Sequence, residues 1–278
     1  MMDIRLIALD MDGTLLNDQK ELSPGNRAAL ESCIRHGIAI VPATGRPSAG
    51  LPAELRTMAG VRYAILTNGA RVEDLQEKKI ISQELIHWEL AYEVLALLSQ
   101  YPVAYDPYIN GRGKMEARFR DHLDQYGLPP AMQKLVLSSR DEVEDELALV
   151  KAWKAPVEKI NIFTTDQKLR MGLWEKLNQY QELVVTSSLE YNLEINAVTA
   201  TKGNALMQLA DHLGLEREQT MAMGDGSNDI SMVASAGIGV AMANGMDIVK
   251  QNADYITLSN EEDGVAAAIR HFLHLPAE

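Results

Sequence analysis

The chain has 278 residues, of which 46% are hydrophobic and 23% charged, the composition of an ordinary soluble protein with one large or two medium domains. Its formal net charge of −13 argues against a surface for nucleic acid or an anionic membrane, because no basic stripe offsets it. No apolar run approaches the roughly 20 residues that span a bilayer, and the N-terminus does not resemble a signal peptide. The single cysteine, Cys33, excludes an intramolecular disulfide framework and is typical of a cytoplasmic protein.

The first predicted element is a short buried strand at residues 6–9, followed directly by Asp10 and Asp12. Four apolar residues without a helical stripe favour a strand that is buried on both faces. Its two carboxylates therefore lie at the carboxyl end of a strand, where open α/β sheets bind ligands. Unpaired charge is costly there, so another part of the chain must compensate it.

Strands and helices then alternate. Ser23 and Pro24 begin a helix that closes at Gly37, and apolar strands follow at residues 38–43 and 63–66. The second strand ends in Thr44-Gly45-Arg46 and the third in Thr67-Asn68-Gly69. This alternation predicts a Rossmann-like α/β core with a parallel sheet and crossover helices.

The pattern changes at residue 84, where we expect an inserted α+β cap domain at residues 84–188. It begins with a helical segment at 85–98 and contains a segment at 158–163 that alternates polar and apolar residues, as in a sheet solvated on one face. Further candidates are a helix at 171–177 and strands at 182–186 and 191–195. The discontinuous core then comprises residues 1–83 and 189–278.

The core pattern resumes at Thr201-Lys202-Gly203, which opens a helix. A strand at residues 220–223 runs into Gly224-Asp225-Gly226-Ser227-Asn228-Asp229. Short strands at 239–242 and 254–257 and a helix at 264–273 complete the chain. Because the carboxyl ends of parallel strands lie at the same edge of the sheet, we expect the polar residues at these strand ends and helix starts to lie near Asp10 and Asp12.

Three carboxylates at one edge, with few basic neighbours, favour a divalent metal ion. Oxygen ligands from Asp10 and Asp225, completed by water, suit Mg²⁺, which also binds phosphate oxygens. For a phosphate ester, Asp10 is the candidate nucleophile, and Lys202 and Mg²⁺ cancel the repulsion between two anions. Asp12 is the candidate general acid for the leaving oxygen and then the base for water.

Further residues are candidates for holding the phosphate, orienting the catalytic groups or contacting the substrate. Thr44 supplies a hydroxyl, Gly45 supplies backbone N–H at a helix N-terminus, and Asn228 supplies an amide donor. Asp229 is expected to orient Lys202 or the metal's waters. Arg46 fits either a phosphate contact or a structural ion pair, and Asn68 with Gly69 fits either a turn or a substrate contact.

These residues also carry a resemblance. Asp10-Met11-Asp12-Gly13-Thr14, Thr44, Lys202-Gly203 and Gly224-Asp225 with Asn228-Asp229 resemble the four motifs of the haloacid dehalogenase superfamily, and most closely its Cof-type sugar-phosphate phosphatases. The resemblance implies a Mg²⁺-dependent phosphatase whose cap closes over the substrate. It also implies a metal held by the side chains of Asp10 and Asp225 and the backbone carbonyl of Asp12.

The leading hypothesis is therefore a phosphatase that hydrolyses small phosphomonoesters, such as sugar phosphates, through an aspartyl-phosphate intermediate. A phosphomutase using the same intermediate and a non-catalytic phospho-ligand binding module are the alternatives. Cap residues Tyr105, Tyr108, His87 and Trp88 are candidates for substrate contact by residue type alone. Nothing in the sequence indicates the oligomeric state.

Overall fold

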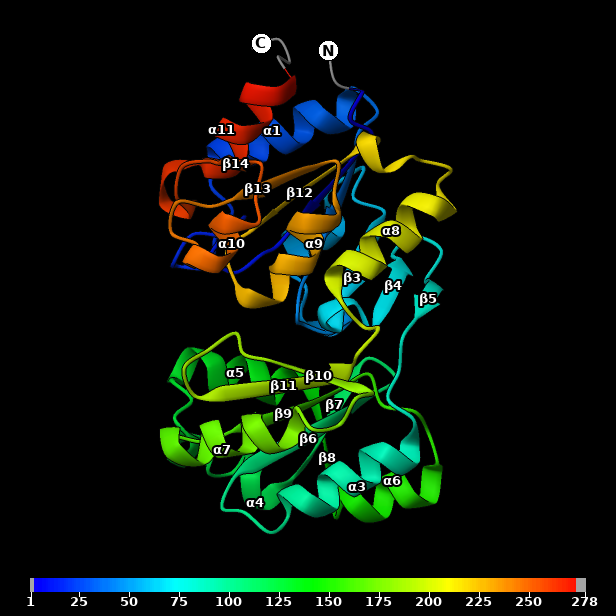
Figure 1. Ribbon diagram of the computed structural model, residues 1–278, viewed down its shortest axis with the longest axis vertical. Helices are drawn as coiled ribbons and strands as arrows, with labels where there is room; N and C mark the ends of the chain where they lie inside the picture. The colour runs from blue at the N-terminus through cyan, green and yellow to red at the C-terminus, as the bar shows by residue number, and fades with distance from the viewer. Residues whose placement is uncertain (1–2, 274–278) are drawn as a thin grey trace. The chain divides into compact units, whose positions relative to one another are not determined.

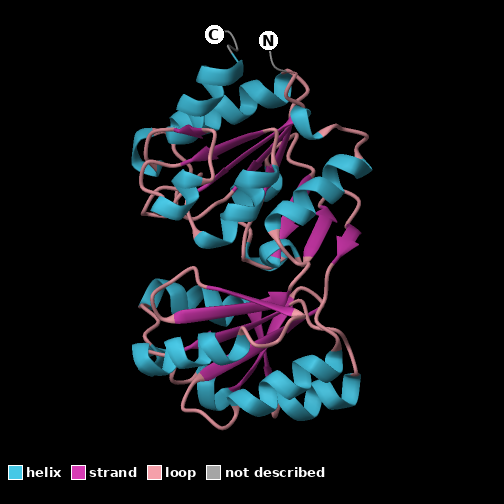
Figure 2. Ribbon diagram, in the orientation of Figure 1, coloured by secondary structure: helices cyan, strands magenta, loops and turns pink. Residues whose placement is uncertain are grey.

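The computed structural model describes residues 3–273, and among these the strands form sheets of five, six and three strands (Figure 1; Figure 2). The chain divides into two compact units. The core unit comprises Met1–Gly45, Pro52–Gln83 and Thr201–Glu278, and the insert unit comprises Arg46–Leu51 and Glu84–Ala200. Within residues 3–273, no helix combines the length and the apolar character needed to cross a membrane.

The core sheet is parallel throughout and has the strand order β14-β13-β12-β1-β2. Its strands are β1 (Leu6–Leu9), β2 (Ala39–Pro42), β12 (Thr220–Gly224), β13 (Ile238–Ala241) and β14 (Tyr255–Ile256). Every residue of β1 and β12 is buried, as expected of central strands covered on both faces. The predicted Rossmann-like α/β core is confirmed.

Helices cover both faces of the core sheet (Figure 1). One face carries α1 (Pro24–Arg35) and α11 (Gly264–Leu273), and the other carries α8 (Lys202–His212), α9 (Ile230–Ser235) and α10 (Asp247–Gln251). The short α2 (Ala53–Thr57) follows β2. Ser23 caps α1 as predicted, since its side chain accepts a hydrogen bond from the N–H of Asn26.

The third predicted core strand belongs mainly to a separate antiparallel sheet. This sheet consists of β3 (Tyr63–Leu66), β4 (Arg71–Asp74) and β5 (Lys79–Gln83). A parallel bridge between Ala43 and Ile65 connects β3 with the end of β2. The strand therefore lies beside the core sheet, while most of its ladder hydrogen bonds go to β4.

The insert sheet has the strand order β10-β11-β9-β6-β7-β8 and is antiparallel except between β7 and β8. Its strands are β6 (Ala104–Ile109), β7 (Arg112–Glu116), β8 (Arg140–Val143), β9 (Lys159–Phe163), β10 (Leu183–Thr186) and β11 (Asn192–Ala197). Its helices are α3 (Trp88–Leu98), α4 (Ala117–Arg120), α5 (Pro130–Ser139), α6 (Glu146–Trp153) and α7 (Gln167–Leu177).

The second boundary of the insert differs from the expected position at residues 188/189. The insert unit continues to Ala200, because β11 lies in the middle of the insert sheet and pairs with both β9 and β10. Its sequence predicts a strand, but the choice of pairing partner is made by long-range contacts.

The polar residues of β9 are buried, which corrects the prediction that one face of this segment is solvated. Lys159 and Asn161 are each 2% exposed. The Nζ of Lys159 lies 2.9 Å from Oε1 of Glu194 on β11, and the amide of Asn161 donates to the carboxylate of Asp106 on β6. Partners on the neighbouring strands thus take the place of water.

Candidate active site

Asp10 directly follows β1 at the carboxyl edge of the core sheet, and it is 6% exposed. Its N–H donates to the carbonyl of Met223 on β12 at 3.0 Å, which joins the ends of the two strands. Its Oδ1 accepts a hydrogen bond at 2.6 Å from the Nζ of Lys202. The carboxylate of Asp10 is thereby compensated by a lysine 192 residues away in the sequence.

Lys202 is the first residue of α8 and is fully buried. The hydroxyl of Thr201 caps this helix by accepting from the N–H of Asn204, which fixes where α8 begins. The Nζ of Lys202 also donates to Oδ1 of Asp229 at 2.5 Å. Burial alone would lower the pKa of Lys202, but the charges of Asp10 and Asp229 raise this pKa above its ordinary range, so the side chain is a cation.

Asp225 and Asp229 lie in the loop after β12. Oδ1 of Asp225 accepts a hydrogen bond at 2.8 Å from the hydroxyl of Thr14. Oδ2 of Asp229 accepts from the N–H groups of Asp225 and Gly226 at 3.0 and 2.9 Å. Both oxygens of Asp229 therefore accept hydrogen bonds from within the protein, as an orienting role requires.

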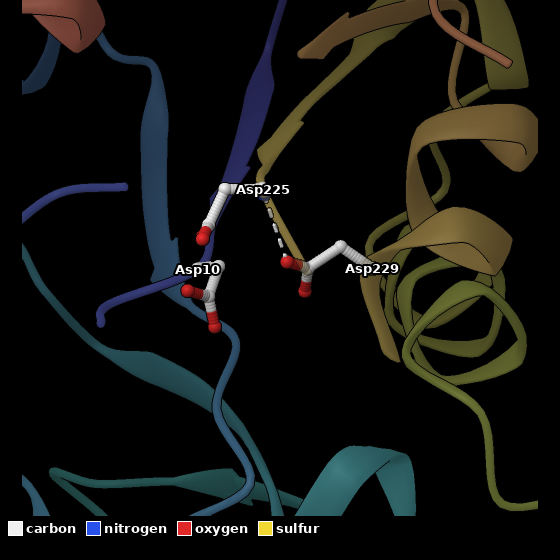
Figure 3. A group of neighbouring side chains, drawn as sticks. All are labelled: Asp10, Asp225 and Asp229. Atoms are coloured by element: carbon white, nitrogen blue, oxygen red, sulfur yellow. Dashed lines mark hydrogen bonds between the residues drawn. The ribbon is translucent and has the colours of Figure 1, made fainter. Parts of the chain in front are cut away.

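Asp10, Asp225 and Asp229 each place one carboxylate oxygen within 4.8 Å of the others (Figure 3). Burial raises the pKa of Asp10 well above its ordinary value of 3.8, and the charge of Asp229 raises it further, against the effect of Lys202. Burial and Asp229 also raise the pKa of Asp225 to about 6. A bound cation relieves such crowding, so this donor set fits a divalent metal ion with oxygen ligands.

Asp12 lies in the loop beyond Asp10 and is more exposed. Its Oδ1 lies 3.1 Å from the Nζ of Lys20, which approaches from further along the same loop. Lys20 is a contact that the sequence does not predict, because nothing in the sequence distinguishes it from a solvated lysine. The role of Thr14 is also not among the predictions, although this residue follows Gly13 in the motif Asp10-Met11-Asp12-Gly13-Thr14, and this position is a signal for a site residue.

The segment after β2 brings Thr44 close to β3 but does not form the predicted helix N-terminus at Gly45. Thr44 is 2% exposed, and its N–H donates to the carbonyl of Ile65 at 2.9 Å. Gly45 lies in a bend, and only a short 3₁₀ helix, η1 (Ser48–Gly50), follows. The early proline at 47 and the glycine at 50 interrupt helical structure here. The guanidinium of Arg46 donates to the carbonyl of Gly50 in its own loop at 3.2 Å.

Asn228 lies in the 3₁₀ turn η5 (Ser227–Asp229) and contacts Asn68. Its Nδ2 donates to Oδ1 of Asn68 at 3.2 Å. The structure thus brings the two asparagines together, although they are 160 residues apart in the sequence.

The four insert residues proposed as substrate contacts occupy different environments. Tyr105 and Tyr108 are 1% and 2% exposed, and Tyr108 packs beneath the cations of Arg140 and Lys159. His87 is exposed at the start of α3 and lies 3.5 Å from Glu89. Trp88 is the first residue of α3. Each of these contacts lies within the insert unit.

This chain is similar to known proteins over nearly its whole length. A family profile described as haloacid dehalogenase-like hydrolase matches residues 7–269. The 5-amino-6-(5-phospho-D-ribitylamino)uracil phosphatase YcsE of Bacillus subtilis (strain 168) is 33% identical over 274 residues, which cover 98% of this chain and 96% of that relative.

Two solved structures are also similar. A haloacid dehalogenase-like hydrolase from B. subtilis has a TM-score of 0.86 and 30% identity, with 97% of this chain and 100% of that chain covered. The subclass IIB sugar phosphatase BT4131 has a TM-score of 0.80 and 25% identity, with 96% and 98% covered. Both similarities extend through the insert.

Proposed function

Because the chain belongs to the haloacid dehalogenase-like hydrolases, as its motifs predict, we propose that it is a Mg²⁺-dependent phosphatase acting on small phosphomonoesters. One observation carries the proposal most directly. The buried cation of Lys202 contacts both Asp10 and Asp229, beside a third carboxylate from Asp225. This arrangement suits the transfer of a phosphoryl group to a carboxylate.

Side chains of Asp10 and Asp225, with the backbone carbonyl of Asp12, are the proposed ligands of Mg²⁺. The structural support is the cluster of carboxylate oxygens and the raised pKa of both side chains. When bound, Mg²⁺ supplies positive charge that screens the carboxylates and the phosphate from each other. Thr14 orients Asp225 by donating to Oδ1.

Asp10 is the proposed nucleophile. One of its carboxylate oxygens forms a bond to phosphorus while the bond from phosphorus to the ester oxygen breaks, which gives an aspartyl-phosphate. Asp12 gives a proton to the departing ester oxygen, so that an alcohol leaves. Asp12 then takes a proton from water as this water attacks phosphorus, and inorganic phosphate and free Asp10 are formed.

Positive charge and hydrogen-bond donors around the transferred group are proposed to come from three residues. Lys202 offsets the charge of Asp10 and of the phosphate. The hydroxyl of Thr44 and the amide of Asn228 are the candidate donors to phosphate oxygens. Asp229 keeps Lys202 in place through the contact at 2.5 Å.

The substrate class we propose is a phosphorylated sugar or sugar-like metabolite. YcsE is named for a substrate with a phosphorylated ribityl chain, and BT4131 is described as a sugar phosphatase. The insert is proposed to act as the cap that covers such a substrate, and the single buried Cys33 suits a cytoplasmic location. For Arg46, the contact with Gly50 favours a structural role in its own loop.

Replacing Asp10 by Asn tests the reaction. We expect Asp10→Asn to lower the Mg²⁺-dependent release of phosphate from p-nitrophenyl phosphate by at least about 10³-fold, because the amide is a poor nucleophile. The matched control is Asp211→Asn, the same change at an exposed position of α8, which should keep full activity.

Two results would contradict the proposal. One is phosphate release by Asp10→Asn at the normal rate. The other is transfer of phosphate only to an added sugar phosphate, with none released when no acceptor is present, which would identify a mutase.

A further inference from the structure

The turn after β3 has an unusual backbone. Thr67, Asn68 and Gly69 form the 3₁₀ turn η2 (Thr67–Gly69), with φ angles of 55°, 60° and 99°. Asparagine and glycine adopt this left-handed region readily, but a β-branched threonine rarely does. Thr67 is fully buried and Asn68 is 3% exposed. Buried strained backbone of this kind persists where surrounding contacts hold it, often at functional sites.

This turn contacts three separate segments of the candidate active site. The N–H of Asn68 donates to the carbonyl of Thr44 at 3.0 Å. The side-chain Oδ1 of Asn68 accepts from Asn228 at 3.2 Å. A Cβ atom on Gly69 would lie 2.2 Å from the carbonyl oxygen of Thr201, so glycine lets the turn pack against the residue that precedes Lys202.

We infer that Asn68 is a positioning residue for phosphate binding, which it supports by fixing the amide of Asn228 and the backbone of Thr44. The inference rests on the proposed function, in which Thr44 and Asn228 hold phosphate oxygens. The terminal torsion of an asparagine side chain is broad. A hydrogen bond from one Nδ2 hydrogen of Asn228 to Asn68 fixes the plane of the amide and directs the second hydrogen.

The chemistry of Asn68 also suits its surroundings. Its amide oxygen is a neutral acceptor, so it orients Asn228 without adding negative charge near Asp10, Asp225 and Asp229. Prior orientation of donors strengthens their contribution to binding an anion, because no reorganisation is needed when the anion arrives.

The variant Asn68→Gly separates the side chain from the backbone. Glycine keeps the left-handed conformation and the N–H that donates to Thr44, and it removes the side-chain oxygen that accepts from Asn228. The matched control is Asn110→Gly, where an exposed asparagine has a φ of 54°. Thermal unfolding of both variants checks that the fold is retained.

The measured quantities are KM and kcat for p-nitrophenyl phosphate, the inhibition constant of inorganic phosphate, and its dissociation constant by calorimetry with Mg²⁺ present. For Asn68→Gly we expect KM and both phosphate constants to rise about tenfold, while kcat changes less. We expect Asn228→Ala to have a similar effect and the double variant to be no worse than either single variant, because the two side chains act as a unit.

Two outcomes would overturn the inference. One is that the inhibition and dissociation constants of inorganic phosphate are unchanged in Asn68→Gly. The other is that the fold-changes of Asn68→Gly and Asn228→Ala multiply in the double variant, which would mean that the two side chains act independently. Asn68→Asp adds an independent check, since it keeps the acceptor but should weaken phosphate binding further through its charge. Failure of the proposed function would look different from failure of this inference. The unmodified protein would then release no phosphate from p-nitrophenyl phosphate, whereas calorimetry would still report phosphate binding.

Discussion

Glu146 is a buried carboxyl group that the proposed reaction does not use. It begins α6, it is fully buried, and its Oε1 accepts from the N–H of Glu116 at 2.8 Å. Burial, with the neighbouring carboxyl of Glu116, raises the pKa of Glu146 to about 9. Burial would also raise the pKa of Glu116, but hydrogen bonds with Glu146 and Arg118 lower it overall. At neutral pH the pair therefore holds one proton, on Glu146, and one negative charge, beside Arg118.

This proton makes the stability of the protein depend on pH. The pKa of Glu146 is above its ordinary value of 4.5 in the folded protein, so unfolding releases the proton at neutral pH. The stabilisation is complete below about pH 4.5 and is lost as pH rises toward 9. We expect the free energy of unfolding, measured with urea, to decrease as pH rises from 5.5 to 8.5, by at most about 1.4 kcal/mol per pH unit for this proton. In Glu146→Gln the fall should be shallower, since the amide replaces the protonated carboxyl.

The control for this prediction is Glu144→Gln, which removes an exposed carboxylate two residues away and should leave the pH dependence unchanged. Equal pH dependence of the unmodified protein and Glu146→Gln would show that Glu146 loses its proton in both states.

At the scale of elements, the contact between α8 and α9 sets the position of Lys202. Gly203, the second residue of α8, lies against α9, and a Cβ atom there would be 2.4 Å from the carbonyl oxygen of Ser231. Its N–H donates to the hydroxyl of Ser231 at 3.1 Å. This close approach at Gly203 keeps its neighbour Lys202 in contact with Asp229.

We therefore expect Gly203→Ala to push α8 away from α9. The contact between Lys202 and Asp229 should lengthen, and kcat/KM should fall at least about tenfold, since small misplacements of catalytic groups are costly. Stability should also fall, by about 1–3 kcal/mol. Both quantities can be measured, by phosphatase assay and by thermal unfolding.

The same substitution in α7 provides the control. Nothing lies within 4 Å of a Cβ atom at Gly172, so Gly172→Ala should stabilise the helix by about 0.5–1 kcal/mol and leave activity unchanged. If Gly203→Ala kept full activity, the spacing of α8 and α9 would not control Lys202.

The core elements and the convergence of Asp10 and Asp225 at one edge of the core sheet were predictable because their signals are local. Apolar runs at β1 and β12 end directly in Asp10 and Asp225, and parallel strands bring such ends together. Partners distant in the sequence decide the features that were not predicted. Lys159 can be buried because Glu194 faces it from β11. The insert extends to Ala200 because β11 pairs with β9. The contact between Asn68 and Asn228 likewise depends on the exact placement of two turns.

At the scale of the whole molecule, the three clustered carboxylates of the candidate metal site belong to one unit. Asp10, Asp225 and Asp229 all lie in the core unit, whereas the insert unit comprises Arg46–Leu51 and Glu84–Ala200. A cation that binds only the folded core unit stabilises that unit by a free energy that rises with the logarithm of the cation concentration, once this concentration exceeds the dissociation constant. It stabilises the insert unit only if both units unfold together.

Hydrogen exchange read by mass spectrometry distinguishes these cases. We expect Mg²⁺, compared with a chelator, to slow exchange in β1 and β12 by about 100-fold at one hundred times its dissociation constant. Exchange in β6 and β9 of the insert should not change, because these strands hydrogen-bond within their own sheet. The slowing should vanish in Asp225→Asn, which removes a proposed ligand. Equal slowing in both units would mean that they unfold as one, and no slowing in the unmodified protein would exclude a stabilising metal site at these carboxylates.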